Sequence, residues 1–154
     1  MRSEGSPSRP RPLVVGRILL YADDRVAAWA SKRMGVEITP PYTSFGLVGS
    51  DGLLRGAMIF NCFNEGSAEV SIYAPRAVSR GSLRAAASYL FQTNGCNRVT
   101  ARTRASSLRV RRFIEKVGFQ QEGVLRAYYK DGEDAILYGL LRSECRWLQT
   151  QEKV

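Results

Sequence analysis

The chain has 154 residues, 44% of them hydrophobic, and carries a formal net charge of +9 at pH 7. Length and composition predict one globular domain at residues 13–150, with a flexible basic arm at residues 1–12 and a short tail at 151–154. No apolar run approaches a membrane span, and the absence of histidine excludes Ser-His-Asp and Cys-His catalysis and histidine-based zinc sites.

The first elements predicted along the chain are a helix and a β-hairpin. Apolar residues at helical spacing predict a helix from Arg25 to Met34, with a preceding aspartate, Asp23 or Asp24, as its N-cap and Gly35 at its end. Two β-like runs follow, at residues 43–48 and 53–63. The Asp-Gly pair between these runs is a strong hairpin signal.

Strands and helices alternate in the middle of the chain. Residues 67–74 form a strand pattern with Glu69, Ser71 and Tyr73 on one face and apolar residues on the other. Helices are predicted at 83–92 and 108–117, with a short strand at 97–103 between them. A second hairpin, 124–129 with 135–141, and a segment at 143–148 close the chain. This order predicts an α/β (α+β) fold with a mixed, mostly antiparallel central sheet and helices on both faces.

Cysteine usage indicates neither a disulfide framework nor a zinc site, because the three cysteines are far apart and form no CxxC pair. Each of them is expected to be a small buried hydrophobic residue. They are Cys62, Cys96 and Cys145. Unpaired thiols are typical of a reducing compartment, which favours a cytoplasmic protein without a metal site.

The net charge is concentrated in one stretch, from Arg76 to Arg112, which we call the basic block. Between Glu69 and Glu115 the chain holds nine arginines and no other charged residue, so the remainder of the chain sums to zero. The nine are Arg76, Arg80, Arg84, Arg98, Arg102, Arg104, Arg109, Arg111 and Arg112. Such a field favours a polyanionic partner, either a phosphate-bearing cofactor or a nucleic acid.

Two motifs lie in and after the basic block. The first opens a helix and reads Arg80-Gly81-Ser82-Leu83-Arg84-Ala85. Unpaired backbone amides at a helix start, together with the helix dipole, form an anion site. The second motif begins at Ser107, follows the next helix to Gly118-Phe119, and continues into Glu122-Gly123.

In this order of elements, the two motifs resemble those of the GNAT N-acetyltransferase superfamily. The likeness is greatest to its small bacterial and phage members related to ribosomal-protein N-acetyltransferases, and it covers residues 23–147. It implies an acetyl-CoA-dependent N-acyltransferase that moves an acetyl group to a primary amine of an unidentified acceptor. In the family the thioester lies between two splayed strands, here those at 67–74 and 97–103.

The resemblance also implies which residues bind coenzyme A. Backbone amides near residues 83–85 would hold the pyrophosphate, and the backbone at 72–74 would hold the thioester carbonyl and the pantetheine arm. The implied cofactor-binding residues are Ile72, Tyr73, Ala74, Arg80, Gly81, Ser82, Leu83, Arg84, Ala85, Ser107 and Arg112. The chain departs from the family pattern at three positions. Leu83 replaces a central glycine, Ser107 an asparagine, and Ile114 a tyrosine that many members use as general acid.

Catalytic candidates lie on the predicted strands. Acetyl transfer needs a deprotonated amine, a polarised carbonyl and close placement of the two. Glu69, directly or through a water, is the candidate base, Tyr73 is the candidate acid, and Asn61 is the candidate for positioning the substrate. Tyr128 and Tyr129 are candidates for lining the acceptor pocket.

Two other classes of function stay open at this point. One is a nucleic-acid-directed protein, either a binder or a nucleobase-modifying transferase, that uses the basic block. The other is a non-catalytic GNAT-fold protein that acts through protein contacts. No membrane partner is expected, and both a monomer and a homodimer remain open.

Overall fold

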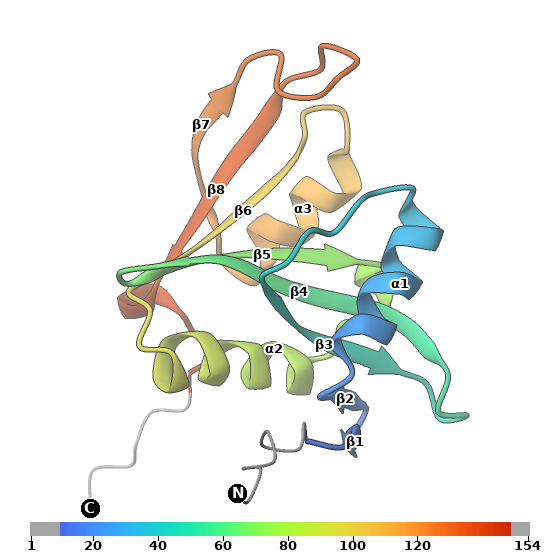
Figure 1. Ribbon diagram of the computed structural model, residues 1–154. Coiled ribbons are helices and arrows are strands. Elements are labelled where there is room, and N and C mark those ends of the chain that lie inside the picture. The colour runs from blue at the N-terminus through green and yellow to red at the C-terminus, as the bar shows by residue number, and fades with distance from the viewer. Residues whose placement is uncertain (1–9, 149–154) are drawn as a thin grey trace, which may run out of the picture.

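One eight-stranded sheet organises the molecule (Figure 1). The computed structural model describes residues 10–148, so positions 1–9 of the predicted arm and the predicted tail lie outside the described residues. In spatial order the strands are β1 (Leu13–Val15), β2 (Ile18–Leu20), β3 (Tyr42–Val48), β4 (Leu54–Asn64), β5 (Ser67–Tyr73), β6 (Arg98–Arg104), β8 (Ala135–Leu141) and β7 (Gln120–Leu125). All neighbours are antiparallel except β5 and β6, which confirms the predicted mixed, mostly antiparallel sheet.

Helices cover both faces of this sheet, as the sequence predicts (Figure 1). They are α1 (Asp23–Met34), α2 (Arg80–Ala87), which continues as a π-helical segment over Ser88–Thr93, and α3 (Leu108–Val117). Side chains alternate between the two faces of a strand, and β4 shows the result. Ala57 and Ile59 pack with residues of α1, whereas Met58 and Phe60 pack in a second core with residues of α2. No helix among residues 10–148 is long and apolar enough to cross a bilayer.

Helix α1 ends at Met34 as predicted, but it begins at Asp23, before the predicted start at Arg25. Gly35 follows the helix in the left-handed conformation at φ +63°, where glycine carries no Cβ penalty. The predicted aspartate cap is wrong, because Ala22 occupies the N-cap position without a side-chain bond. Asp23 instead accepts a hydrogen bond of 2.6 Å from Ser44 Oγ, which ties the start of α1 to β3.

Helix α2 begins at Arg80, three residues before the predicted start at position 83. The cause is a capping box that the sequence analysis missed. Ser79 Oγ accepts from the Ser82 amide at 3.1 Å, and Ser82 Oγ accepts from the Ser79 amide at 2.9 Å. Because Leu83 N already donates to Ser79 O, the helix is formed by that residue.

The second predicted hairpin is correct in β8 and wrong in its partner strand. Strand β7 ends at Leu125, and the nine residues 126–134 form a loop in place of a strand reaching position 129. The Asp-Gly turn lies at the tip of this loop, where Gly132 N donates to Tyr129 O at 2.8 Å. The N-terminal hairpin of β1 and β2 was not predicted.

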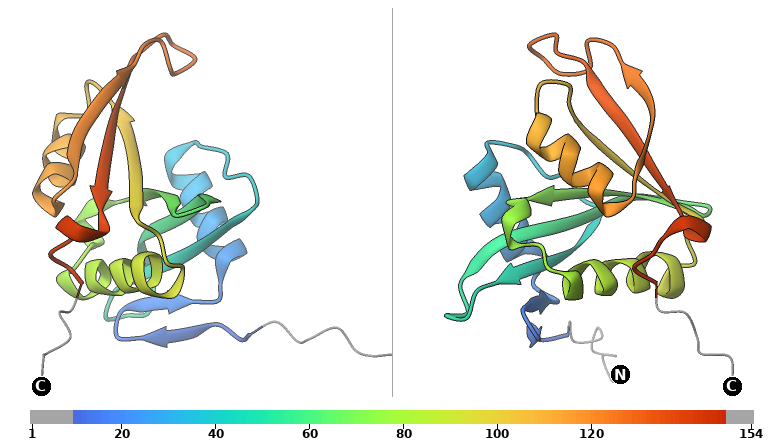
Figure 2. Two further views of the ribbon diagram at one scale, coloured as in Figure 1. Left: turned by 90° about the vertical axis from the view of Figure 1, so that its left-hand side faces the viewer. Right: turned by 180° about the vertical axis from the view of Figure 1, so that it is seen from behind.

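The feature that positions the site is the divergence of β5 from β6. Their ladder contains three residue pairs, Ser67 with Arg98, Ala68 with Val99 and Glu69 with Thr100. Beyond Glu69, β5 continues beside β4 while β6 stays paired with β8 along its whole length. Figure 2 shows that the two strands run apart. The sheet therefore opens at its centre.

We expect Gly56→Ala to destabilise the fold. A Cβ on Gly56 would lie 2.8 Å from Ala77 Cβ and 3.0 Å from Tyr73 O, so β4 and the turn after β5 would have to move apart. Overpacking of this kind costs about 1–3 kcal/mol of unfolding free energy, which urea denaturation can measure. Gly123→Ala on β7 is the matched control, because nothing lies within 4 Å of its added Cβ. An equal loss in the two variants would contradict this account.

Candidate active site

A cavity of about 520 Å³ opens where β5 and β6 separate. Its walls come from both strands, from α3, from the segment at the end of α1 and from the loop 126–134. Concave spaces of this size are typical of sites for small molecules and cofactors. Glu69 and Tyr73, the predicted base and acid, both line it. The structure thus brings together two of the three catalytic candidates.

Glu69 lies at the point of divergence in an ion pair with β6. Its Oε2 accepts a hydrogen bond of 2.7 Å from Arg102 Nη2. The Arg102 guanidinium also stacks 5.2 Å from the ring centroid of Tyr128. The predicted base is therefore a carboxylate already bound to a cation, a partner that the sequence analysis did not assign.

Tyr73 lies farther along β5 and is partly buried. Burial raises the pKa of its phenol, and a hydrogen bond with Ser71 opposes that effect. The group is therefore protonated at neutral pH and is able to donate a proton or a hydrogen bond. This state fits the predicted role of an acid.

Asn61, the third catalytic candidate, does not line the cavity. It lies on β4 directly opposite Glu69. Its Oδ1 atom is buried and has no hydrogen-bond partner among residues 10–148. A buried acceptor without a partner is costly, so a ligand or water would be favoured there.

The predicted anion site at the start of α2 requires a correction. The amides of residues 83–85 lie inside the helix, and the Ser82 amide is bound by the capping box. The amides that remain at the helix start are those of Arg80 and Gly81. Arg76, Arg80 and Arg84 lie exposed around this start. The Leu83 side chain packs against the core, away from the exposed end of the helix.

Residues from α3 complete the inner wall of the cavity. Ser107, Val110 and Ile114 line it, and Ile114, the position at which the sequence resemblance implies a tyrosine, is buried. Arg112, the other cofactor candidate on this helix, is exposed and does not line the cavity. Tyr138 of β8 holds α3 in place through hydrogen bonds with Arg111 and Glu115 at 3.2 and 3.0 Å.

In the folded chain, ion pairs neutralise part of the positive charge of the basic block. Arg98 pairs with Glu122 at 2.5 Å, Arg102 with Glu69, and Arg104 with both Asp131 and Glu133. These carboxylates lie outside the block in sequence. Among the residues that the structure describes, five of its arginines have neither an ion pair nor a hydrogen bond from the side chain. They are Arg76, Arg80, Arg84, Arg109 and Arg112.

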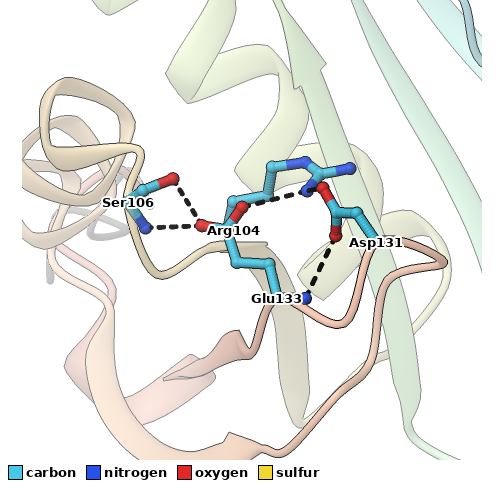
Figure 3. Close-up of polar contacts among 4 residues, drawn as sticks. All are labelled: Arg104, Ser106, Asp131 and Glu133. Carbon is cyan, nitrogen blue, oxygen red and sulfur yellow. Dashed lines mark hydrogen bonds and ion pairs between the residues drawn. The ribbon is translucent and has the colours of Figure 1, made fainter.

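One polar network, which we call the latch, fixes the loop 126–134 beside the cavity (Figure 3). Arg104 Nη1 donates to Asp131 at 2.8 Å and to Glu133 at 3.0 Å. Glu133 also accepts from the amide of Ser106 at 2.8 Å and from its hydroxyl. Because Arg104 stacks 4.1 Å from the ring centroid of Tyr129, the latch also places that ring.

Two tyrosines of this loop were candidates for the acceptor pocket, and both line the cavity. Tyr128 and Tyr129 meet edge to face, with ring centroids 5.1 Å apart. Met34 and Val36, which the sequence analysis did not single out for the site, line it from the end of α1. Their only sequence signal was an apolar character next to the end of a helix.

The cysteines do not contribute a nucleophile to the cavity. All three are unpaired, and none lines the cavity. Cys96 is buried as predicted, whereas Cys62 is exposed and Cys145 is intermediate, so the prediction is wrong for these two. Desolvation raises the pKa of both Cys62 and Cys96, which keeps their thiols protonated at neutral pH. No metal-ligand cluster occurs within the part of the chain that the structure describes.

The latch predicts a specific dependence of stability on pH. The pKa of Asp131 is lowered first by a hydrogen bond from the Glu133 backbone amide and then by one from Arg104. The pKa of Glu133 is lowered first by hydrogen bonds from the Ser106 hydroxyl and amide and then by one from Arg104. Carboxyl groups with lowered pKa values stabilise the fold above their ordinary pKa of about 4 and lose that contribution as pH falls through the folded-state values. We expect Glu133→Gln to flatten the fall in melting temperature below about pH 4.

Thermal denaturation between about pH 2 and pH 6 would measure this effect. Glu65→Gln, in the turn between β4 and β5, is the matched control outside the latch. The same pH slope in the wild type and in Glu133→Gln would show that the latch carboxylates contribute nothing to folding stability.

No model of a known protein family matches the chain. Over 55 residues the chain is 38% identical to an uncharacterized N-acetyltransferase of Methanocaldococcus jannaschii. This alignment covers 36% of the chain and 35% of the relative, so the chain matches only about a third of that protein's length.

Solved structures share the fold over a larger part of the chain. A variant of the spermidine N-acetyltransferase of Vibrio cholerae has a TM-score of 0.60 at 18% identity and covers 85% of this chain and 79% of its own. A GNAT-family acetyltransferase of Bacillus anthracis has a TM-score of 0.55 at 22% identity and covers 66% and 67%. The likeness to ribosomal-protein N-acetyltransferases stays a prediction. The wider resemblance is confirmed, since this chain has the fold of the GNAT N-acetyltransferases.

Proposed function

We propose that the chain is an acetyl-CoA-dependent N-acetyltransferase that acts on a primary amine. The observation that carries the proposal is the cavity between the diverging strands β5 and β6, which holds a carboxylate and a protonated tyrosine on one strand. The short N-acetyltransferase alignment and the shared fold support the same reaction class.

Binding of coenzyme A is proposed at the exposed start of α2 and along β5. The Arg80 and Gly81 amides and the helix dipole suit a pyrophosphate, and the nearby arginines add positive charge. A Cβ built on Gly81 would meet only Ser79 Oγ, at 3.7 Å, so there is room for a ligand. Backbone groups at 72–74, beyond the β5–β6 ladder, suit the pantetheine arm. Ser107 lines the cavity farther in.

The proposed chemistry divides between two side chains of the cavity. A bound thioester supplies an electrophilic carbonyl, to which the amine nitrogen forms a bond as the carbon–sulfur bond breaks. Glu69, directly or through a water, accepts the proton that the amine loses. Tyr73 donates a proton to the departing sulfur, since burial keeps its phenol protonated. Holding the two reactants together supplies a large part of the rate enhancement.

The nucleic-acid alternative has less support from the structure than from the sequence. The ion pairs of Arg98, Arg102 and Arg104 neutralise a third of the basic block. The remaining exposed arginines include those around the start of α2, where a pyrophosphate would bind. We therefore favour a nucleotide cofactor as the anionic partner.

Arg84→Glu is expected to weaken the binding of acetyl-CoA by about tenfold or more, because it sets a like charge beside the pyrophosphate. Calorimetry at low salt measures the dissociation constant. Arg142→Glu is the matched control, since it makes the same charge change at an exposed arginine that follows β8 and lies outside the start of α2. Equal weakening in the two variants would indicate only a general charge effect.

A different result would favour the alternative function. Duplex DNA bound at low micromolar concentration, with a steep loss of affinity on adding salt and displacement by coenzyme A, would place a nucleic acid on this face. No binding of acetyl-CoA at millimolar concentration would remove the basis of the proposed reaction.

Tyr73→Phe is expected to lower kcat by about a hundredfold, the usual contribution of one general acid. A mass-spectrometric screen of primary amines with acetyl-CoA would first identify an accepted amine, and steady-state kinetics would then give kcat. Tyr21→Phe is the control, because Tyr21 is exposed and lies outside the cavity. Full activity in Tyr73→Phe would exclude Tyr73 as the acid.

A further inference from the structure

We infer that the acceptor is an amine that carries an aromatic or similarly flat apolar group, and that this group binds against Tyr128 and Tyr129. The inference rests on the proposed function for the reaction and adds the chemical class of the acceptor. It also assigns Glu133 as a positioning residue that acts through the loop 126–134.

Exposed apolar side chains at the cavity mark the place where this group binds. Met34 is 52% exposed, Val36 is 38% exposed and Tyr128 is 47% exposed, although all three line the same cavity. They come from two separate parts of the chain, the end of α1 and the loop 126–134. Large apolar side chains that line one cavity and remain in contact with water mark a binding surface for an apolar group.

The edge-to-face geometry of the tyrosine pair suits a flat ligand. The two rings are perpendicular within 2°, at an interplanar angle of 88°, and so form a corner. A third ring placed in such a corner gains offset or edge contacts with both tyrosines, each worth about 0.5–1.5 kcal/mol beyond simple burial. The corner therefore selects for shape as well as for apolar character.

Charge at the cavity disfavours an acceptor with several positive charges. The guanidinium groups of Arg102 and Arg104 already lie over the faces of Tyr128 and Tyr129, so a second cation on those rings would meet a like charge. The carboxylate of Glu69 is bound to Arg102. Within residues 10–148, Glu37 is the one carboxylate of the cavity wall without an ion pair. One carboxylate suits a single ammonium group and leaves the further charges of a polyamine unpaired.

The latch holds Tyr128 and Tyr129 in place before the acceptor binds. Glu133 receives hydrogen bonds from Ser106 and from Arg104 (Figure 3). The Arg104 guanidinium in turn stacks on the ring of Tyr129. A loop of nine residues would otherwise pay an ordering cost each time the acceptor binds. Glu133 therefore contributes to acceptor affinity without touching the acceptor.

The test compares 2-phenylethylamine with spermidine on the full chain. Calorimetry in the presence of coenzyme A measures binding of each amine, and mass spectrometry with acetyl-CoA measures transfer. We expect 2-phenylethylamine to bind at least about tenfold more tightly and to have the larger kcat/KM. Tyr129→Ala should remove about tenfold of that preference, whereas Tyr21→Ala, an exposed tyrosine outside the cavity, should leave it unchanged.

Glu133→Gln separates positioning from a merely structural role. We expect a raised KM for 2-phenylethylamine with an unchanged dissociation constant for acetyl-CoA, together with faster amide hydrogen exchange confined to residues 126–134. If Glu133→Gln weakened the binding of acetyl-CoA as much as it raised the KM for 2-phenylethylamine, Glu133 would only stabilise the fold.

The outcomes distinguish the acceptor class from the reaction. Preferred binding of 2-phenylethylamine without acetyl transfer would support the aromatic subsite and overturn the proposed function. Acetylation of spermidine as efficient as that of 2-phenylethylamine would overturn the acceptor class and leave the reaction in place. Unchanged preference in Tyr129→Ala would also overturn the inference.

Discussion

The divergence of β5 from β6 after three residue pairs is the constraint on which the site depends. β6 is held along all seven of its residues by β8, and β5 is held by β4, so neither strand can follow the other. Backbone groups next to the gap lack the partner that a continuous sheet would supply, and buried backbone groups need one. A ligand that lies in the gap can supply those hydrogen bonds, which is how an interrupted sheet becomes a binding site.

Ion pairs neutralise the arginines that β6 brings to the cavity. Alternating positions of β6 send Arg102 and Arg104 to one face of the strand, where Glu69 and the latch carboxylates meet them. The charge that remains unpaired in the basic block lies at the start of α2 and on the outer side of α3. The proposed phosphate site and the proposed acceptor site therefore use different arginines, although all of them come from one stretch of sequence.

The bounds of three segments show which structural signals are local in the sequence and which are not. The helix at Leu108–Val117 was predicted with its observed bounds, because apolar spacing and a terminal glycine are local signals. The start of α2 was predicted three residues late, since a serine capping box was not recognised. Residues 126–129 were predicted to continue the strand, as the high β-propensity of Tyr128 and Tyr129 favours, yet the latch holds them in the loop 126–134.

The sequence by itself determined the order of elements from α1 onward, the mixed sheet and the candidate pair Glu69 and Tyr73, because hydrophobic periodicity and motif spacing are local properties of the chain. Only the tertiary structure decided which arginines remain unpaired, that Asn61 lies outside the cavity, and that Met34 and Tyr129 line the same space. Those facts depend on contacts between residues far apart in sequence. Glu69 and Arg102, for example, are separated by 33 positions and meet only because two strands run side by side before they separate.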